Sequence, residues 1–305
     1  MEEKNRRIIG NTAALTVIAA GFLAGGMYLS RLNTEKKDTE ERIRTLEAEA
    51  TEMRVKTEAA EDLILSHEEA LAALDGAEDR PAAEKERYYS LCKELEDAVL
   101  DGKADCKIAY LTFDDGPYVN TTPLFLDVLD EYDVLATFFM LGKPGEENDA
   151  IYHRIYDTGH TIGNHTYAHA MQTWLYESAE NFLGDVKKNR EFIQEKLGIT
   201  TNLVRFPGGS SSSRGHLAEI AEGLREMGYG YVDWNSATWD SIALLSPEEY
   251  RDHVLEETWD RKVLVVLMHD YSHNTLAALP EIITGLREQG YVLLPLFYDS
   301  AMVSK

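Results

Sequence analysis

The sequence predicts an α/β domain with a parallel sheet or barrel at residues 107–305, preceded by a membrane-spanning helix and a helical stalk. Apolar, β-rich runs alternate with helix-like segments after residue 106, and this alternation is typical of parallel sheets. Four polar clusters lie at the ends of such runs, where parallel α/β folds place their sites. Near the N-terminus, one long apolar stretch carries no charge.

That apolar stretch is residues 8–30, which begin with Ile8 and end with Ser30. As a helix it covers ~30 Å, the thickness of a bilayer core. Basic residues precede it at Lys4, Arg6 and Arg7, which predicts a cytoplasmic tail at residues 1–7 and an extracellular C-terminal region. We therefore expect a single-pass protein of the cell membrane.

A cleaved signal peptide is the alternative to the anchor, and it would make the protein secreted. Ala24-Gly25-Gly26 offers small residues for cleavage. The apolar stretch is longer than the ~7–15 residues usual in signal peptides, so the anchor is favoured.

Residues 31–80 predict the stalk, because residues 34–75 contain neither Gly nor Pro and are rich in charge. Apolar positions at alternating spacings of three and four run from Ile43 to Leu74, which is a heptad pattern. Ala, Thr and His interrupt it, so a weak homodimer through a coiled coil and a single solvated helix both remain open. Residues 81–106 are predicted to be a linker with a short helix around residues 84–100.

The chain is acidic, with 54 Asp and Glu residues against 30 Lys and Arg and a net charge of -24. Nucleic-acid binding requires a basic face, so nucleic acid is excluded as a partner. Two cysteines, Cys92 and Cys106, are too few for a disulfide framework, and there is no C-x-x-C pair. A single Cys92–Cys106 disulfide and two buried free thiols are both compatible with the sequence.

Within residues 107–305, composition and periodicity predict the elements of the sheet and its helices. Strands are expected at residues 107–113, 135–141, 203–206, 230–233, 263–268 and 291–295. Helices are expected at residues 122–132, 183–197, 217–227, 247–259 and 279–289. Pro123 lies in the first turn of the first of these helices, where proline is favoured.

The first polar cluster is Thr112-Phe113-Asp114-Asp115-Gly116-Pro117, directly after a strand. Two adjacent carboxylates repel each other unless a cation or a proton separates their roles. Asp115 is therefore a candidate metal ligand and Asp114 a candidate base. A solvated Asp-Gly-Pro turn is the alternative.

The second cluster contains His165 and His169, whose spacing of four places both imidazoles on one face of a helical turn. With Asp115 they form a set of two histidines and one carboxylate, which binds a metal and leaves positions open for water and substrate. Two histidines at this spacing also occur by chance. No H-E-x-x-H is present, so a zinc protease of that type is not supported.

The third cluster, Arg205-Phe206-Pro207-Gly208-Gly209, follows another apolar run. Its arginine can hold a carboxylate, and its glycines allow backbone amides to approach a substrate oxygen; a plain turn is the alternative. The fourth cluster ends an apolar strand at His269 and Asp270. His269 is a candidate general acid, although a histidine in this position is often only a core residue.

In this order and at these separations, TFDDGP, HxxxH, RFPG and the strand ending in LMHD resemble the polysaccharide deacetylases (carbohydrate esterase family 4, the NodB-homology domain). ATFFMLG at residues 136–142 adds to the likeness. The resemblance covers about residues 107–300, whereas the predicted anchor and stalk lie outside it. It implies a distorted, incomplete (β/α) barrel with its site at the C-terminal ends of the strands.

The resemblance also implies roles for individual residues. Asp115, His165 and His169 would bind a divalent metal, most often zinc, with Co²⁺, Mn²⁺ or Ni²⁺ as alternatives. Asp114 would be the general base that takes a proton from the metal-bound water, and His269 the acid that protonates the leaving amine. Further roles would be those of Arg205, which holds the base, and Leu267, which contacts the acetyl methyl group.

Two positions depart from the family pattern. After Pro207 the family commonly has an aromatic residue that walls the groove, but here the residue is Gly208. The family's Asp-x-x-Asp-Trp corresponds loosely to Ala237-Thr238-Trp239-Asp240-Ser241. Asp240 is therefore assigned as the partner of His269, and Trp234 or Trp239 as a replacement for the missing aromatic; Pro207 and Gly208 are kept as substrate-binding residues.

The activity that the resemblance implies is removal of acetyl groups from N-acetylglucosamine in a cell-envelope polysaccharide. Peptidoglycan is the polymer expected, because the anchor and stalk would hold the domain in the wall. Chitin oligomers or an exopolysaccharide are alternatives within this class. A catalytically silent glycan-binding or scaffold protein on the same fold is the rival from another class.

Overall fold

The computed structural model of the chain describes residues 80–258 and 261–305. The predicted tail, membrane anchor and all of the stalk except its last residue lie outside these residues. Within them, no helix is both long enough and apolar enough to cross a membrane. The chain divides into two compact units, Met1–Cys106 and Lys107–Lys305.

In the first unit the structure describes one helix, α3 (Arg80–Leu100). The helix is therefore longer than the short segment predicted for the linker. Both cysteines are free thiols, and Cys92 is buried in this unit. The disulfide alternative is not formed. Burial raises the pKa of the Cys92 thiol to about 12, which keeps it protonated and unreactive.

In the second unit, eight parallel strands form one sheet in the described part of the chain, in the order β5-β4-β3-β2-β1-β7-β6, with β8 also paired to β1. The path has two ends, so the sheet does not close into a complete barrel. Its strands are β1 (Lys107–Asp114), β2 (Thr137–Met140), β3 (Thr161–Asn164), β4 (Leu203–Val204), β5 (Gly230–Tyr231), β6 (Ser236–Ala237), β7 (Val263–His269) and β8 (Tyr291–Leu294).

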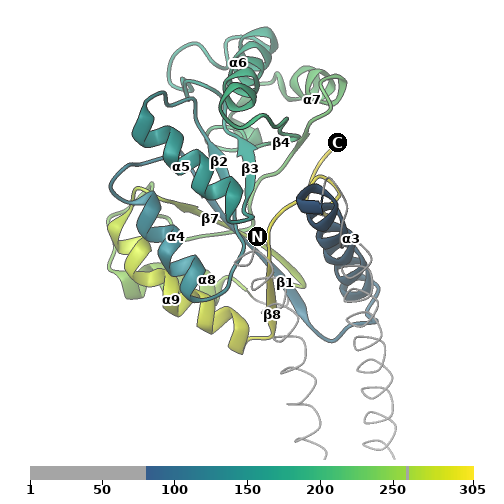
Figure 1. Ribbon diagram of the computed structural model, residues 1–305, viewed down its shortest axis with the longest axis vertical. Coiled ribbons are helices and arrows are strands. Elements are labelled where there is room, and N and C mark those ends of the chain that lie inside the picture. The colour runs from purple at the N-terminus through teal and green to yellow at the C-terminus, as the bar shows by residue number, and fades with distance from the viewer. Residues whose placement is uncertain (1–79, 259–260) are drawn as a thin grey trace, which may run out of the picture. The chain divides into compact units, whose positions relative to one another are not determined.

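The helices of this unit follow the order of the strands. α8 packs on α9, α9 on α4, α4 on α5, α5 on α6 and α6 on α7, and Figure 1 shows α4, α5 and α9 alongside the strands. Their bounds are α4 (Thr122–Glu131), α5 (Glu146–Asp157), α6 (Ala179–Leu197), α7 (Leu217–Glu226), α8 (Pro247–Glu256) and α9 (His273–Glu288). This arrangement confirms the predicted parallel α/β fold for residues 107–305.

The apolar core lies between the sheet and these helices. Phe113 on β1 stacks on Phe138 of β2 and meets the edge of Phe125 on α4. All residues of β7 are buried, as expected for a strand covered on both faces. Burial of β1 and β7 explains why both were predictable as continuous apolar runs.

Some elements were not predicted, namely α5, β3 and β6. β3 has the sequence TIGN, with one large apolar residue and no alternation to read. α9 begins at His273, six residues before the predicted start, because the Ser272 hydroxyl accepts a hydrogen bond from the Thr275 amide and caps the helix. α8 also ends earlier than predicted, at Glu256.

Candidate active site

Strand register brings the polar clusters to one edge of the sheet. Asp114 is paired laterally with His269 at the end of β7 and with Phe139 on β2. At the end of β3 the Asn164 carbonyl accepts a hydrogen bond from the Arg205 amide. Since all these strands are parallel, their C-terminal ends meet in one place.

At this edge, Asp115, His165 and His169 converge. A carboxylate oxygen and one ring nitrogen from each histidine lie within 4.8 Å of one another. Asp115 Oδ1 is 3.5 Å from His165 Nε2 and 3.3 Å from His169 Nε2. Two imidazoles and one carboxylate at these separations form a donor set that suits zinc and other divalent transition metals.

One candidate ligand atom in this group makes no hydrogen bond in the part of the chain that the structure describes. Asp115 Oδ1 is buried and lacks a hydrogen-bond partner within the described residues. A buried carboxylate oxygen without a hydrogen-bond partner raises the free energy of the folded state. A cation bound to this oxygen would offset that cost. The donor set and this orphaned oxygen both fit a divalent metal ion.

His165 presents a neutral nitrogen to the cluster. Its Nδ1 lies 2.8 Å from the Arg205 carbonyl oxygen, which can only accept, so Nδ1 carries the hydrogen and Nε2 carries the lone pair. Burial lowers the pKa of His165 to about 3, against the opposing charge of Asp115. A neutral imidazole with a fixed tautomer is the form that binds metals.

The segment from His165 to His169 is an irregular loop rather than the helical turn expected from the spacing. Thr166 and His169 have left-handed φ angles of 67° and 51°. The buried Asp185 on α6 accepts hydrogen bonds from two amides of this loop, each 2.9 Å long. Tertiary contacts therefore impose a conformation that local periodicity does not predict.

The loop that carries Asp115 is also held by tertiary contacts. Asp115 itself has a φ of 72°. Lys143 Nζ donates to the carbonyl oxygens of Asp115 and Pro117, at 2.7 and 3.1 Å. Gly116 must lack a side chain, because a Cβ there would lie 2.6 Å from Asp270 Oδ2. The lysine and the glycine together hold the backbone of the loop that carries Asp115.

Asp114 is buried beside a fully buried arginine. Arg205 Nη1 donates to Asp114 Oδ1 at 3.1 Å and to Thr112 Oγ1 at 2.5 Å. Its other nitrogens donate to the carbonyl oxygens of Val232 and Asp233, at 3.1 and 3.2 Å. Burial raises the pKa of the Asp114 carboxyl, and Arg205 and His269 oppose that rise. Asp114 thus has the position and the raised pKa of a general base.

His269 is held by Asp240. The histidine Nδ1 lies 2.6 Å from Asp240 Oδ1, and its amide donates to Asp240 Oδ2 at 2.9 Å. Thr275 on α9 also donates to Asp240, at 2.7 Å. Burial by itself lowers the pKa of His269, but the hydrogen bond and charge of Asp240, with the charges of Asp114 and Asp115, raise it to about 9. The imidazole is therefore cationic at neutral pH, as an acid must be.

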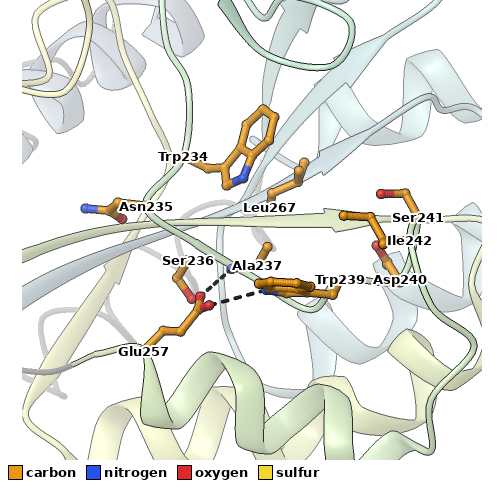
Figure 2. A pocket seen from close by; sticks show the side chains of 10 residues that line it. All are labelled: Trp234, Asn235, Ser236, Ala237, Trp239, Asp240, Ser241, Ile242, Glu257 and Leu267. Atoms are coloured by element: carbon orange, nitrogen blue, oxygen red, sulfur yellow. Dashed lines mark hydrogen bonds between the residues drawn. The ribbon is translucent and has the colours of Figure 1, made fainter. Parts of the chain in front are cut away.

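A pocket of about 340 Å³ opens beside Asp240. Trp234, Trp239 and Leu267 line it, together with Glu257. Figure 2 shows the two indoles on opposite sides of the pocket with Leu267 between them. The structure thus brings three of the five predicted substrate-binding residues to one place, next to the predicted partner of His269, whereas Pro207 and Gly208 do not line this pocket.

The sequence predicts that the groove lacks an aromatic wall at Gly208, and the structure places Met171 beside this residue. Gly208 is exposed and has a φ of 72°. A Cβ at this position would lie 2.6 Å from the Met171 methyl carbon, so Met171 occupies the space next to the missing aromatic side chain. Pro207 is buried, and its carbonyl oxygen accepts a hydrogen bond from the Tyr176 hydroxyl at 2.8 Å. Its place is that of a structural turn residue.

Sequence reasoning missed several residues that shape the site: Lys143, Met171, Asp185, Glu257 and Thr275. Asp185 left a readable signal, because with Asn189 it shares the buried face of α6 with Phe182, Val186 and Ile193. A polar residue on such a face usually has a buried partner. The other four lie far along the chain from the groups they contact, and no local pattern marks them.

Comparison with known proteins agrees with this geometry. A family model described as polysaccharide deacetylase matches residues 101–232. A peptidoglycan-N-acetylglucosamine deacetylase of Bacillus cereus is 33% identical over 194 residues, 61% of this chain and 67% of the relative. The peptidoglycan-N-acetylmuramic acid deacetylase PdaA of Bacillus subtilis is 31% identical over 198 residues, 64% of this chain and 72% of the relative.

Among solved structures, the catalytic domain of a peptidoglycan N-acetylglucosamine deacetylase from Eubacterium rectale has 31% identity and a TM-score of 0.60. The match covers 66% of this chain and 93% of that domain. This chain spans only 65% of the length of one further curated relative and 38% of another. The sequence matches, the curled parallel sheet and the site at its edge lead to one conclusion: the chain belongs to the polysaccharide deacetylase family.

Proposed function

We propose that this protein is a metal-dependent hydrolase that removes the acetyl group from N-acetylglucosamine residues of peptidoglycan. One observation carries the proposal. Asp115, His165 and His169 form a divalent-metal donor set around a buried carboxylate oxygen without a partner. Asp114 and His269 flank that set, with Asp114 Oδ2 3.7 Å from His165 Nε2 and His269 Nε2 4.0 Å from Asp115 Oδ2.

A metal held by Asp115, His165 and His169 would supply positive charge that polarises the amide carbonyl and lowers the pKa of water. Zinc is our choice, because the ligands are two neutral imidazoles and one carboxylate.

In this mechanism Asp114 accepts a proton from the attacking water. The pKa of its carboxyl is raised by burial, which increases its basicity, while Arg205 orients it through Oδ1. Once the tetrahedral adduct has formed, His269 donates a proton to the departing nitrogen, and the C–N bond breaks to give acetate and a free amine. Asp240 keeps His269 cationic for this step.

Trp234 and Leu267 give the acetyl methyl group an apolar surface within the pocket. Peptidoglycan is the preferred polymer because the relatives quoted above are named for it. The test is acetate release by the purified full-length protein, supplied with zinc, from peptidoglycan, chitin oligomers and acetylated xylan. Acetate from peptidoglycan is expected, and Asp114→Asn should slow its release by about 10²–10⁴-fold.

Other outcomes of this assay separate the alternatives. Release from chitin oligomers without release from peptidoglycan would change the polymer but keep the chemistry. Release from acetylated xylan alone would indicate an esterase. Binding of glycans without any release would indicate a silent scaffold protein.

We also propose that residues 8–30 anchor the protein in the cell membrane with the catalytic domain outside. The basic residues before this stretch and the absence of charge within it support the orientation. Protease added to intact, wall-stripped cells should remove the domain. Full protection in sealed cells would reject this topology, and a shorter secreted form would indicate signal cleavage.

A further inference from the structure

Resting on the proposed deacetylase function, we propose that Trp239, His253 and Glu257 form a sugar subsite that accepts an uncharged N-acetylhexosamine ring and disfavours a ring that bears a carboxylate. Neither His253 nor Glu257 belongs to the catalytic groups described above. His253 lies on α8, and Glu257 is the residue that ends this helix.

The first element of the subsite is an exposed aromatic surface. Trp239 remains 44% exposed although it lines the pocket. It has a φ of 67°, which is unusual for a residue with a side chain. His253 stacks on the indole with ring centroids 5.5 Å apart and planes 15° from parallel. The indole is therefore supported from α8 while much of its surface faces solvent.

Glu257 fixes the orientation of this indole. The Trp239 Nε1–H group donates to Glu257 Oε1 at 3.3 Å, and the Ala237 amide donates to Oε2 at 3.0 Å (Figure 2). With the ring stacked on one side and its N–H group bound at one edge, Trp239 is held as a rigid plate. Holding an aromatic group in its bound position reduces the entropy lost on binding.

A pyranose ring fits this surface. Sugars present C–H groups on their faces and hydroxyl groups around their edges, so they bind where an aromatic face lies beside hydrogen-bonding groups. The pocket holds about 340 Å³, within the range of small-ligand sites. Leu267, two residues before His269, lines the same pocket, which places the ring beside the catalytic acid.

The charge of the subsite is negative. Asp240 is neutralised in part by His269. The Glu257 carboxylate accepts hydrogen bonds from the neutral Trp239 indole and the neutral Ala237 amide. Arg261 is nearby, but its guanidinium donates to the backbone carbonyls of Glu257 and Asn235 rather than to this carboxylate. A carboxylate on the ligand would face the Glu257 charge at close range, which is unfavourable.

The negative charge of Glu257 should distinguish the two sugars of peptidoglycan. N-acetylglucosamine is neutral, whereas N-acetylmuramic acid carries a lactyl carboxylate when its peptide has been removed. The subsite should therefore prefer N-acetylglucosamine, and Glu257 becomes a specificity-determining residue. Conversion of the lactyl group to an amide should remove the electrostatic part of the discrimination.

The experiment measures binding of three tetrasaccharides to the metal-free full-length protein by calorimetry. These ligands are chitotetraose, the alternating N-acetylglucosamine/N-acetylmuramic acid tetrasaccharide with free lactyl carboxylates, and the same tetrasaccharide as its methyl amide. Glutamine offers one acceptor oxygen where the carboxylate offers two, so Glu257→Gln loses one of the two hydrogen bonds and should weaken both neutral ligands by a similar small factor. Relative to these neutral ligands, the acid should bind about three- to tenfold tighter than it does in the wild type. Trp239→Ala should weaken all three by about tenfold or more.

Glu256→Gln is the matched control, because it removes the same charge from the adjacent, exposed residue, which does not line the pocket. A second test needs no variant: added salt should narrow the wild-type difference between acid and amide ligands. The subsite is wrong if Glu257→Gln and Glu256→Gln act alike, if the acid and amide ligands bind equally to the wild type, or if Trp239→Ala leaves binding unchanged.

These results are separable from the catalytic proposal. Sugar binding with the predicted selectivity but without acetate release would reject the deacetylase function and retain the subsite. Acetate release with the same KM in wild type, Glu257→Gln and Trp239→Ala would retain the function and reject the subsite.

Discussion

The two sides of the candidate active site are held in place by different kinds of contact. The β1–β4 side comprises Asp114, Asp115, His165, His169 and Arg205. There, buried side chains bind backbone carbonyls and amides: Arg205 is fully buried and uses each of its guanidinium nitrogens. The β6–β7 side comprises Trp239, Asp240, Glu257, Leu267 and His269. It is held by hydrogen bonds between side chains, from Trp239 to Glu257 at the end of α8 and from Thr275 of α9 to Asp240, and Trp239 is 44% exposed.

This difference indicates how each side responds to substitution. On the β1–β4 side a single substitution leaves a buried charge or a metal-ligand atom unpaired. The loss of metal binding or of activity should therefore be nearly complete. On the β6–β7 side only His269 acts on the reacting bond. Changes at Asp240, Trp239 or Glu257 shift a pKa or alter a surface, and their effects should be graded. The following predictions test that contrast, from the largest expected effect to the smallest.

The largest effects are expected for the metal ligands and the base. Asp115→Ala, His165→Ala or His169→Ala should sharply reduce bound zinc, because each removes one donor from a three-residue set. Asp114→Asn should retain zinc yet lower kcat/KM by about 10²–10⁴-fold, the usual contribution of a general base. Metal analysis and acetate release together separate these cases.

His153→Ala, an exposed histidine on α5, is the control for loss of an imidazole. Stoichiometric zinc in an Asp115→Ala/His169→Ala double variant would show that the metal ligands are other residues.

The next effect concerns the leaving group. His269→Ala should slow hydrolysis of the amide substrate by about 10²–10⁴-fold. It should slow an aryl acetate far less, because a phenolate leaves without a proton. The comparison of kcat/KM for the two substrates measures proton donation directly, and exposed His273 provides the matched alanine control. Equal losses on both substrates would assign His269 a role other than protonation of the amine.

The pH profile should show a graded effect. Asp114 works when deprotonated and His269 when protonated, so kcat/KM should rise as Asp114 loses its proton and fall as pH passes the His269 pKa, raised to about 9. Asp240→Asn removes the charge that opposes desolvation of His269, so the alkaline limb should move to lower pH. An unchanged alkaline limb in this variant would mean that Asp240 does not control the acid.

The smallest effect concerns the wall at Gly208. Gly208→Ala would place a Cβ on a residue with a φ of 72° and close to Met171. The variant should therefore lower the free energy of unfolding by about 1–2 kcal/mol. Gly184→Ala is the matched control of opposite sign. Gly184 lies inside α6, a Cβ there meets nothing within 4 Å, and alanine should stabilise the protein by about 0.5–1 kcal/mol. Denaturant unfolding measures both; destabilisation by Gly184→Ala or stabilisation by Gly208→Ala would contradict the account.

Local sequence predicted the parts of this protein whose signals lie within a few residues. β1 and β7 are buried on both faces and therefore appear as continuous apolar runs. The Asp114-Asp115 pair follows directly from the end of β1, and Pro123 marks the first turn of α4. The family likeness rests on such short motifs, since chemistry at strand ends needs particular residues at close spacing.

Tertiary structure decided the features that depend on distant partners. The conformation of the His165–His169 loop is set by Asp185 on α6, and its left-handed residues do not follow from helical spacing. The wall beside Gly208 comes from Met171, which no motif connects with it. Glu257 reaches the pocket because α8 packs beside β6. The physical reason is common to all three: backbone conformation and side-chain direction there are determined by contacts between segments that only folding brings together.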